Sequence, residues 1–236
     1  MAHGSRRNGR PPEHLRLCHI HYPDNVTERV KRISEPHVAP LNDWVANIRR
    51  NASLPDGAGD TIPWFDPESA GVAARALLLL QDPSAVAAGN RFISPHNCDD
   101  TARNTMDVCA AAGLGYELRC HWNVFPWWVN TDGVDRTRAL MSLAAAAPIA
   151  ARLLPEVLSQ FRSLAVIVVA GVGATNGFRF TEAAGFAARS GTSVVEIDSL
   201  SALGGFSRNR DRIVSRLAEV TEAIRSGRHL ELRRSV

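Results

Sequence analysis

Four short apolar runs, separated by segments with helical periodicity, constrain the fold of this chain more than any other feature. The runs are residues 76–80, 118–125, 163–171 and 192–198. Continuous apolar strands that alternate with helices are typical of a parallel sheet that is covered on both faces. The sequence therefore predicts an α/β fold, a three-layer α/β/α arrangement around a central, mainly parallel four-stranded sheet.

Apolar residues recur at helical spacing in the segments between these runs. Two N-terminal helices are expected within residues 26–50, where Pro36 and Pro40 separate the two pieces. Further helices are predicted at residues 101–113, with Gly113 as the C-cap, and at residues 209–226. The segment 139–161 is also expected to be helical but broken at its two prolines, Pro148 and Pro155.

The length of 236 residues and the hydrophobic share of 45% fit one globular domain. Residues 1–16 are polar and rich in arginine and proline, and we expect a flexible N-terminal tail there and a single domain over residues 17–236. No apolar run approaches the roughly 20 residues that cross a bilayer, and the first residues lack the apolar stretch of a secretion signal. The sequence predicts a cytoplasmic protein with no membrane partner.

Charge and cysteine content narrow the function classes only slightly. The formal net charge of +3 is too small to demand a polyanionic partner, so a nucleic-acid ligand must be argued from a local site. The 4 cysteines include no CxxC pair, which argues against a zinc ribbon, a small disulfide framework or an iron–sulfur cluster. We expect reduced thiols and no metal.

In a parallel sheet the ligand crevice lies at the carboxyl ends of the strands, so the loops that follow them should carry function. The first of these loops begins with Gln81, Asp82 and Pro83, directly after a strand of leucines. A carboxylate at the end of a strand whose surroundings exclude water is well placed to orient a single water molecule or to face a developing cation. A simple strand-terminating turn accounts for the same residues.

A second loop, residues 123–130, begins at the end of the strand predicted within residues 118–125 and is unusually aromatic. Asn123 lies at its start, and a buried amide can read the edge of a flat heterocycle with one donor and one acceptor. Phe92 could stack on the same heterocycle, and Arg208 and Arg210 with Ser201 could contact phosphates. Ordinary core packing and a solvated helix entry are the alternative explanations for these residues.

The sequence GVGATNG at residues 171–177 has the composition of a dinucleotide fingerprint, because it follows a strand and precedes Glu196 and Asp198. Such a unit normally opens its domain, whereas this one begins late in the chain and leaves too few residues for the remaining sheet. We interpret these glycines as positions of close backbone packing at a strand end.

Taken in order, these segments resemble the uracil-DNA glycosylase superfamily from about Trp64 to the C-terminal helix. LLQDP is similar to the first active-site motif, so that Asp82 matches the water-activating aspartate and the backbone around Gln81 faces O2 of the base. FISPHNCDDTARN resembles the segment with the stacking aromatic, which implies that role for Phe92, and HWNVFPWW resembles the strand end with the uracil-reading asparagine, Asn123. SLAVIVVAGVGA looks like the strand and turn before the last motif.

The chain departs from the family pattern in two places. The last motif usually contains His-Pro-Ser, but the corresponding residues 196–210 contain no histidine, and His96 is a candidate substitute. Ser84 follows the Gln-Asp-Pro turn where the family has a bulky aromatic that excludes thymine. In the 199–210 loop, we expect Leu200 or Leu203 to act as a wedge and Ser201, Arg208 and Arg210 to contact DNA.

The resemblance implies a cofactor-free, cytoplasmic and monomeric glycosylase that flips uracil out of single- or double-stranded DNA and leaves an abasic site. Two other functions remain open. One is a slow or non-catalytic binder of uracil-containing or abasic DNA, which the missing histidine suggests. The other is a nucleotide-cofactor enzyme that uses residues 171–177.

Overall fold

The computed structural model describes residues 13–18, 21–50, 54, 57–129 and 143–230. Most of the predicted tail, residues 1–12, lies outside these ranges, as does the start of the helix expected from residue 139. Residues 13–15 of the tail form a 3-10 turn, and the Asn25 side chain donates to the backbone oxygens of Glu13 and Arg16.

The centre of the molecule is a four-stranded parallel sheet with the strand order β4-β2-β5-β6. The strands are β2 Ala76–Leu80, β4 Arg119–Asn123, β5 Val166–Ala170 and β6 Ser193–Ile197. Each falls inside one of the four predicted apolar runs. Both faces of the inner strands β2 and β5 are covered, which explains why their sequences are continuously apolar rather than alternating. The predicted fold class is confirmed.

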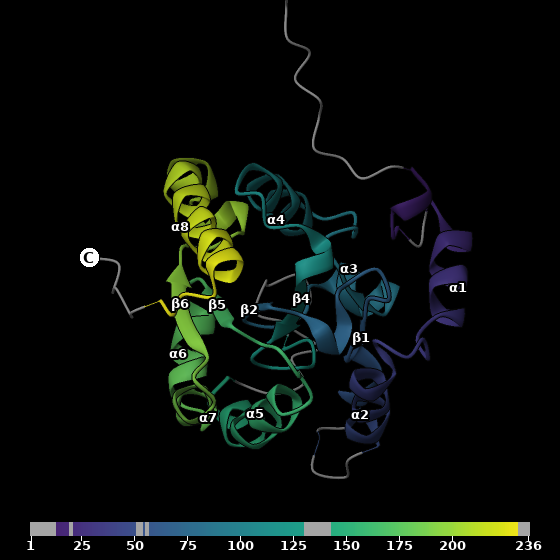
Figure 1. Ribbon diagram of the computed structural model, residues 1–236. Coiled ribbons are helices and arrows are strands. Elements are labelled where there is room, and N and C mark those ends of the chain that lie inside the picture. The colour runs from purple at the N-terminus through teal and green to yellow at the C-terminus, as the bar shows by residue number, and fades with distance from the viewer. Residues whose placement is uncertain (1–12, 19–20, 51–53, 55–56, 130–142, 231–236) are drawn as a thin grey trace, which may run out of the picture.

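Two helices, α4 (Asp100–Ala111) and α8 (Phe206–Ser226), cover one face of the sheet (Figure 1). Their apolar sides pack on the side chains that β2, β5 and β6 direct to this face, including Leu78 and Val168. Gly113, just beyond α4, has a φ of 66°, in the left-handed region that glycine adopts without strain.

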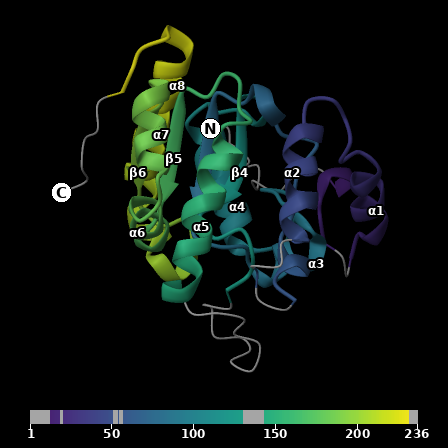
Figure 2. The same cartoon turned by 90° about the horizontal axis from the view of Figure 1, so that it is seen from below.

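Helices from before β2 and from between β4 and β6 cover the other face (Figure 2). They are α2 Ala39–Arg49, α5 Leu143–Leu158, α6 Val172–Arg179 and α7 Ala183–Ser190. The predicted break of α5 at Pro148 and Pro155 is wrong, because the helix continues through both prolines. Proline removes a helical hydrogen bond, but the buried apolar side of this helix, which includes Leu154 and Val157, holds it against the sheet.

A smaller N-terminal layer lies beside β4 and contains α1 (Pro23–Lys31) and a two-stranded parallel sheet. The small sheet pairs β1 (Trp64–Phe65) with β3 (Phe92–Ile93), and α3 (Ala85–Asn90) leads into β3. The elements β1, β3 and α3 are too short to give a periodic signal, and the sequence did not predict them. Short 3-10 helices complete the fold: η1 Glu13–Leu15, η2 Gly59–Thr61, η3 Gly71–Ala73, η4 Tyr116–Leu118 and η6 Ala202–Gly204.

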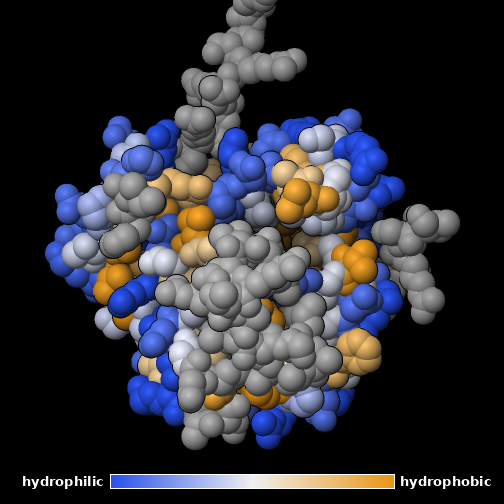
Figure 3. All heavy atoms as spheres, turned by 180° about the vertical axis from the view of Figure 1, so that it is seen from behind, coloured by the Kyte–Doolittle hydropathy of each residue, from blue (hydrophilic) through white to orange (hydrophobic). Residues whose placement is uncertain are grey.

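Figure 3 shows a mostly hydrophilic face with separate hydrophobic patches. Within the described ranges, every helix is too short or too polar to cross a bilayer.

Candidate functional site

A cavity of about 390 Å³ opens at the carboxyl edge of the parallel sheet. Its walls come from the segments after β2, β4, β5 and β6, together with the start of α4. The position agrees with the expectation that the crevice of such a sheet lies beyond its strand ends.

Asn123, the last residue of β4, lines this cavity and is 0% exposed. Among the described residues, neither its amide oxygen nor its amide nitrogen has a hydrogen-bond partner. A buried, unpaired polar group costs about 1–3 kcal/mol, and native proteins rarely carry one without a reason. An amide with both its donor and its acceptor unused is therefore a strong candidate for binding a ligand.

Gln81 and Asp82 follow β2 and line the same cavity. The Gln81 side chain donates to Asp82 Oδ1 over 3.0 Å, and the Val129 backbone N–H donates to Asp82 Oδ2 over 3.2 Å. These bonds orient the half-buried carboxylate at the sheet edge. Because β2 pairs with β4 in the register Leu80 to Asn123, Asp82 and Asn123 belong to neighbouring strand ends.

The glycines of residues 171–177 lie at points of close approach, as the sequence predicted. An ideal Cβ on Gly173 would lie 1.6 Å from Oε1 of Gln81, and one on Gly177 would lie 2.8 Å from the Val124 side chain. The Gln81 side chain thus packs directly on the first turn of α6. This contact fills space that a cofactor phosphate would need at a fingerprint turn.

Ser84 and Asp99 form the wall beside Asp82. Ser84 caps α3 by accepting from the Ala87 backbone N–H, and Asp99 caps α4 by accepting from the Ala102 N–H. The Ser84 hydroxyl also donates to Asp99 Oδ2 over 3.1 Å. Both side chains therefore have structural partners as well as a place in the wall.

The two candidates for a wedge, Leu200 and Leu203, differ in their exposure. Leu200 is 2% exposed and packs in the core, whereas Leu203 is 95% exposed at the cavity rim. Leu203 is therefore better placed than Leu200 to act as a wedge. Ser201 lines the cavity, and Asn104 of α4 holds the loop by donating to the Leu200 carbonyl.

The two arginines predicted to contact DNA differ in their surroundings. Arg208 is exposed near the start of α8. Arg210 makes a two-pronged ion pair with Asp107 of α4, with Nε to Oδ2 at 2.6 Å and Nη2 to Oδ1 at 3.1 Å. The ion pair occupies the guanidinium N–H groups of Arg210 that would otherwise bind a phosphate. Arg208 is therefore better placed than Arg210 to contact DNA.

Phe92 does not line the cavity, so it is not placed to stack on a base bound there. Its side chain is 0% exposed and packs with Leu17 and Val26 in a separate apolar cluster outside the cavity. The next residue, Ile93, lines the cavity instead, because successive side chains of a strand point to opposite faces. The sequence correctly placed this segment beside the cavity. Strand β3, which the sequence did not predict, determines that Ile93 rather than Phe92 faces the cavity.

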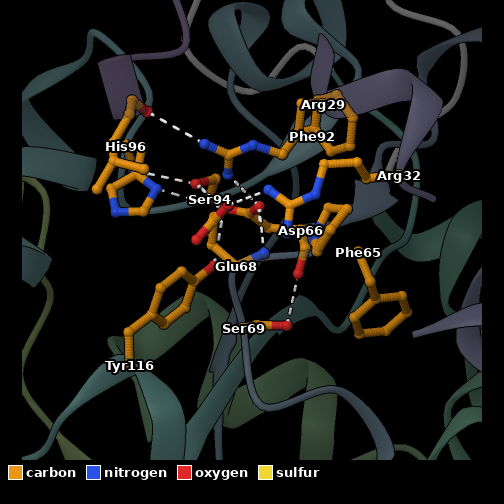
Figure 4. Close-up of polar contacts among 12 residues, drawn as sticks. Arg29, Arg32, Phe65, Asp66, Glu68, Ser69, Phe92, Ser94, His96 and Tyr116 are labelled. Atoms are coloured by element: carbon orange, nitrogen blue, oxygen red, sulfur yellow. Dashed lines mark hydrogen bonds and ion pairs between the residues drawn. The ribbon is translucent and has the colours of Figure 1, made fainter. Parts of the chain in front are cut away.

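His96 is likewise displaced from its predicted position at the bound base. It is 6% exposed, lies outside the lining of the main cavity, and places Nδ1 3.5 Å from Oδ2 of the buried Asp66 (Figure 4). Asp66 also forms an ion pair with Arg29 and accepts from the hydroxyls of Ser94 and Tyr116. His96 therefore belongs to a polar cluster that joins α1 to the loops after β1 and β3.

Burial by itself would raise the pKa of Asp66, but the neighbouring His96 and Arg29 and the Ser94 hydroxyl hold it well below its ordinary value of 3.8. A carboxyl whose folded pKa is depressed stabilises the protein fully above its unfolded pKa. We therefore expect the contribution of Asp66 to be present at neutral pH and to be lost as the pH falls below about 3.8.

Replacing Asp66 with asparagine should lower the free energy of unfolding by about 3–5 kcal/mol at pH 7, because Arg29 would be left buried without its counter-charge. Urea unfolding measures this effect. Glu35→Gln is the matched control, since the Arg32–Glu35 pair is partly exposed and its loss should cost at most about 1 kcal/mol. Equal losses in the two variants would contradict the assigned role of Asp66.

Among the cavity-wall residues that sequence reasoning missed are His121 and Trp128. His121 precedes Asn123 by two residues, so strand alternation alone could have placed both side chains on one face. Trp128 was part of an aromatic run, and nothing in that run distinguishes a wall residue from a core residue such as Trp127.

No group of three or more histidine, cysteine, aspartate or glutamate side chains in the described parts of the chain is arranged to hold a metal ion. No protein-family model and no curated protein matches this sequence.

Proposed function

We propose that this protein is a DNA glycosylase that hydrolyses the N-glycosidic bond of uracil in DNA. The observation that carries the proposal is the fully buried, unpaired amide of Asn123 in a cavity whose edge also holds Asp82. The order of the motifs along the chain supports the same assignment.

The cavity can take one flipped pyrimidine. An enzyme that acts on a base cannot reach it within the stack, so the nucleotide must rotate out of the helix into a pocket. The amide of Asn123 can donate to O4 of uracil and accept from N3–H. Cytosine presents the opposite arrangement at these two positions, and its binding would leave buried polar groups unpaired.

Asp82 would act in the step that breaks the glycosidic bond. As the bond between C1′ and N1 breaks, its electron pair leaves with the base and positive charge develops on the sugar. The carboxylate of Asp82 stabilises that charge and accepts a proton from the water that attacks C1′. Backbone N–H groups near Gln81 receive the charge that develops on O2, and the released base takes its proton from solvent.

Trp128 is better placed than Phe92 to cover the base. It is half-buried, it lines the cavity, and its backbone N–H donates to the Thr61 hydroxyl over 3.0 Å. An indole offers a flat, apolar surface on which a pyrimidine can stack.

Leu203 would enter the helix stack as the base leaves it, because it is the exposed leucine at the rim. Leu203→Ala should lower uracil excision from duplex DNA by about tenfold or more, since unstacking one step costs a few kcal/mol. The same substitution should hardly change excision from single strands or the melting temperature, because Leu203 is 95% exposed. Equal losses on both substrates would argue against a wedge.

The direct test is single-turnover cleavage of an oligonucleotide with one central uracil, in excess chelator, beside matched thymine and cytosine oligonucleotides. Abasic-site formation with uracil alone is the expected result. Thymine excision would show that Ser84 leaves room for the methyl group. Binding of uracil-containing DNA without any product would contradict glycosylase activity and favour the DNA-binding alternative.

A further inference from the structure

His121 lies deeper in the cavity than Asn123. Both residues belong to β4, are two positions apart, and line the same cavity. His121 pairs in register with Leu78 of β2, whereas Asn123 pairs with Leu80 at the strand end. At about 3.3 Å per residue, the His121 backbone is therefore about 6.6 Å further from the edge at which a ligand enters.

The position of the ring proton of His121 is fixed by a neighbouring buried side chain. Arg119 donates from Nε to Nε2 of His121 over 3.2 Å. A guanidinium has only donors, so Nε2 must carry the lone pair. Arg119 is itself held in place, because it donates to the Leu114 carbonyl and lies 5.0 Å from the centre of the Tyr116 ring.

The imidazole is also neutral at pH 7. Burial, and then the charge of Arg119, keep the pKa of His121 well below its ordinary value of 6.5. A neutral ring whose Nε2 accepts must carry its single proton on Nδ1. No described residue accepts a hydrogen bond from this Nδ1, so an N–H donor is left unused at a residue that lines the cavity.

We propose that Nδ1–H of His121 donates a hydrogen bond to the carbonyl oxygen at C4 of the bound base and thereby selects 4-keto over 4-amino pyrimidines. This inference rests on the proposed glycosylase function. The sugar stays outside, so the ring atom opposite N1, which is C4, reaches furthest toward the floor of the cavity. The amino group of cytosine would meet this N–H donor against donor, which buries unpaired hydrogens.

The same donor would assist bond cleavage. When N1 leaves with the electron pair of the glycosidic bond, part of the negative charge of the base resides on O4. A pre-oriented N–H at that oxygen stabilises the charge without reorganisation. His121 would touch the reacting base, and Arg119 would act through it as a positioning residue.

The first test measures binding without cleavage. Oligonucleotides with 2′-fluoro-2′-deoxyuridine or 2′-fluoro-2′-deoxycytidine resist hydrolysis, and fluorescence anisotropy gives their dissociation constants. His121→Leu should lose about 10–100-fold of the preference for the uridine probe. His121→Gln, which keeps an N–H donor, should retain most of it, and His229→Gln, on the exposed C-terminal segment, should not change it.

The second test uses the wild-type protein alone, so it does not depend on whether a variant folds or binds. Long-range proton–nitrogen correlation spectra of the wild-type protein, labelled with nitrogen-15 in its histidines, report which ring nitrogen of His121 is protonated. The Nδ1–H form should dominate in the free protein, and the uridine probe should shift this signal. A proton on Nε2, or an Nδ1–H signal that the bound probe leaves unchanged, would overturn the inference even if His121→Leu fails to fold.

The results separate the two proposals. If the wild type excises uracil but His121→Leu keeps its full preference, the role of His121 is wrong and the glycosylase assignment stands. If the wild type neither excises uracil nor prefers the uridine probe, both are wrong.

Discussion

Asp82→Asn is expected to lower the single-turnover rate of uracil excision by about 10²–10⁴-fold, the range typical for loss of a positioned general base. The substitution removes the charge that faces the developing cation and the group that accepts the proton of water. It keeps the size of the side chain and one oxygen for the Val129 N–H. Binding of the uridine probe should therefore change little, and the loss should fall on the chemical step.

Asp99→Asn is the matched control for this experiment. Asp99 lines the same cavity, but it caps α4 by accepting from the Ala102 N–H, and asparagine caps a helix equally well. Its excision rate should stay close to that of the wild type. An unchanged rate in Asp82→Asn, or an equal loss in both variants, would remove Asp82 from the proposed mechanism.

Asn123→Leu should abolish the preference for uracil and at the same time stabilise the free protein. Leucine has a similar volume but cannot donate to O4 or accept from N3–H. Because both polar atoms of the Asn123 amide are buried and unpaired, their removal should raise the free energy of unfolding by about 1–3 kcal/mol. Urea unfolding and probe binding measure the two effects on the same preparation.

Asn97→Leu distinguishes this effect from a general response to apolar substitution. Asn97 also lines the cavity and is buried, but its amide donates to the Phe92 carbonyl and accepts from Asn90. Its replacement should destabilise the protein. If Asn123→Leu is destabilised as well, the amide of Asn123 has a structural partner and is not reserved for a ligand.

The fold was predictable to the extent that it depends on long apolar patterns. Each strand of the four-stranded sheet lies within a predicted run, because an inner parallel strand buries both faces and so consists of continuous apolar residues. Elements of two residues, such as β1 and β3, leave no such pattern. The continuous path of α5 through Pro148 and Pro155 depends on packing against the sheet, which no local rule contains.

The candidate site was predictable where residues directly follow predicted strands. Gln81, Asp82 and Asn123 line one cavity because parallel strands bring their carboxyl ends to the same edge. Phe92 and His96 were misplaced because the loop that carries them contains β3, whose pairing with β1 turns their side chains away from the cavity.

The sheet, its parallel sense and the edge at which the cavity opens follow directly from which segments are apolar and where each segment ends. Which side chains face the cavity, and which have partners elsewhere, depends instead on how distant segments pack together. Leu200 and Leu203 have the same chemistry, yet one is buried in the core and the other lies open at the rim. Exposure and hydrogen bonding depend on segments distant in sequence, as the ion pair between Arg210 and Asp107 illustrates.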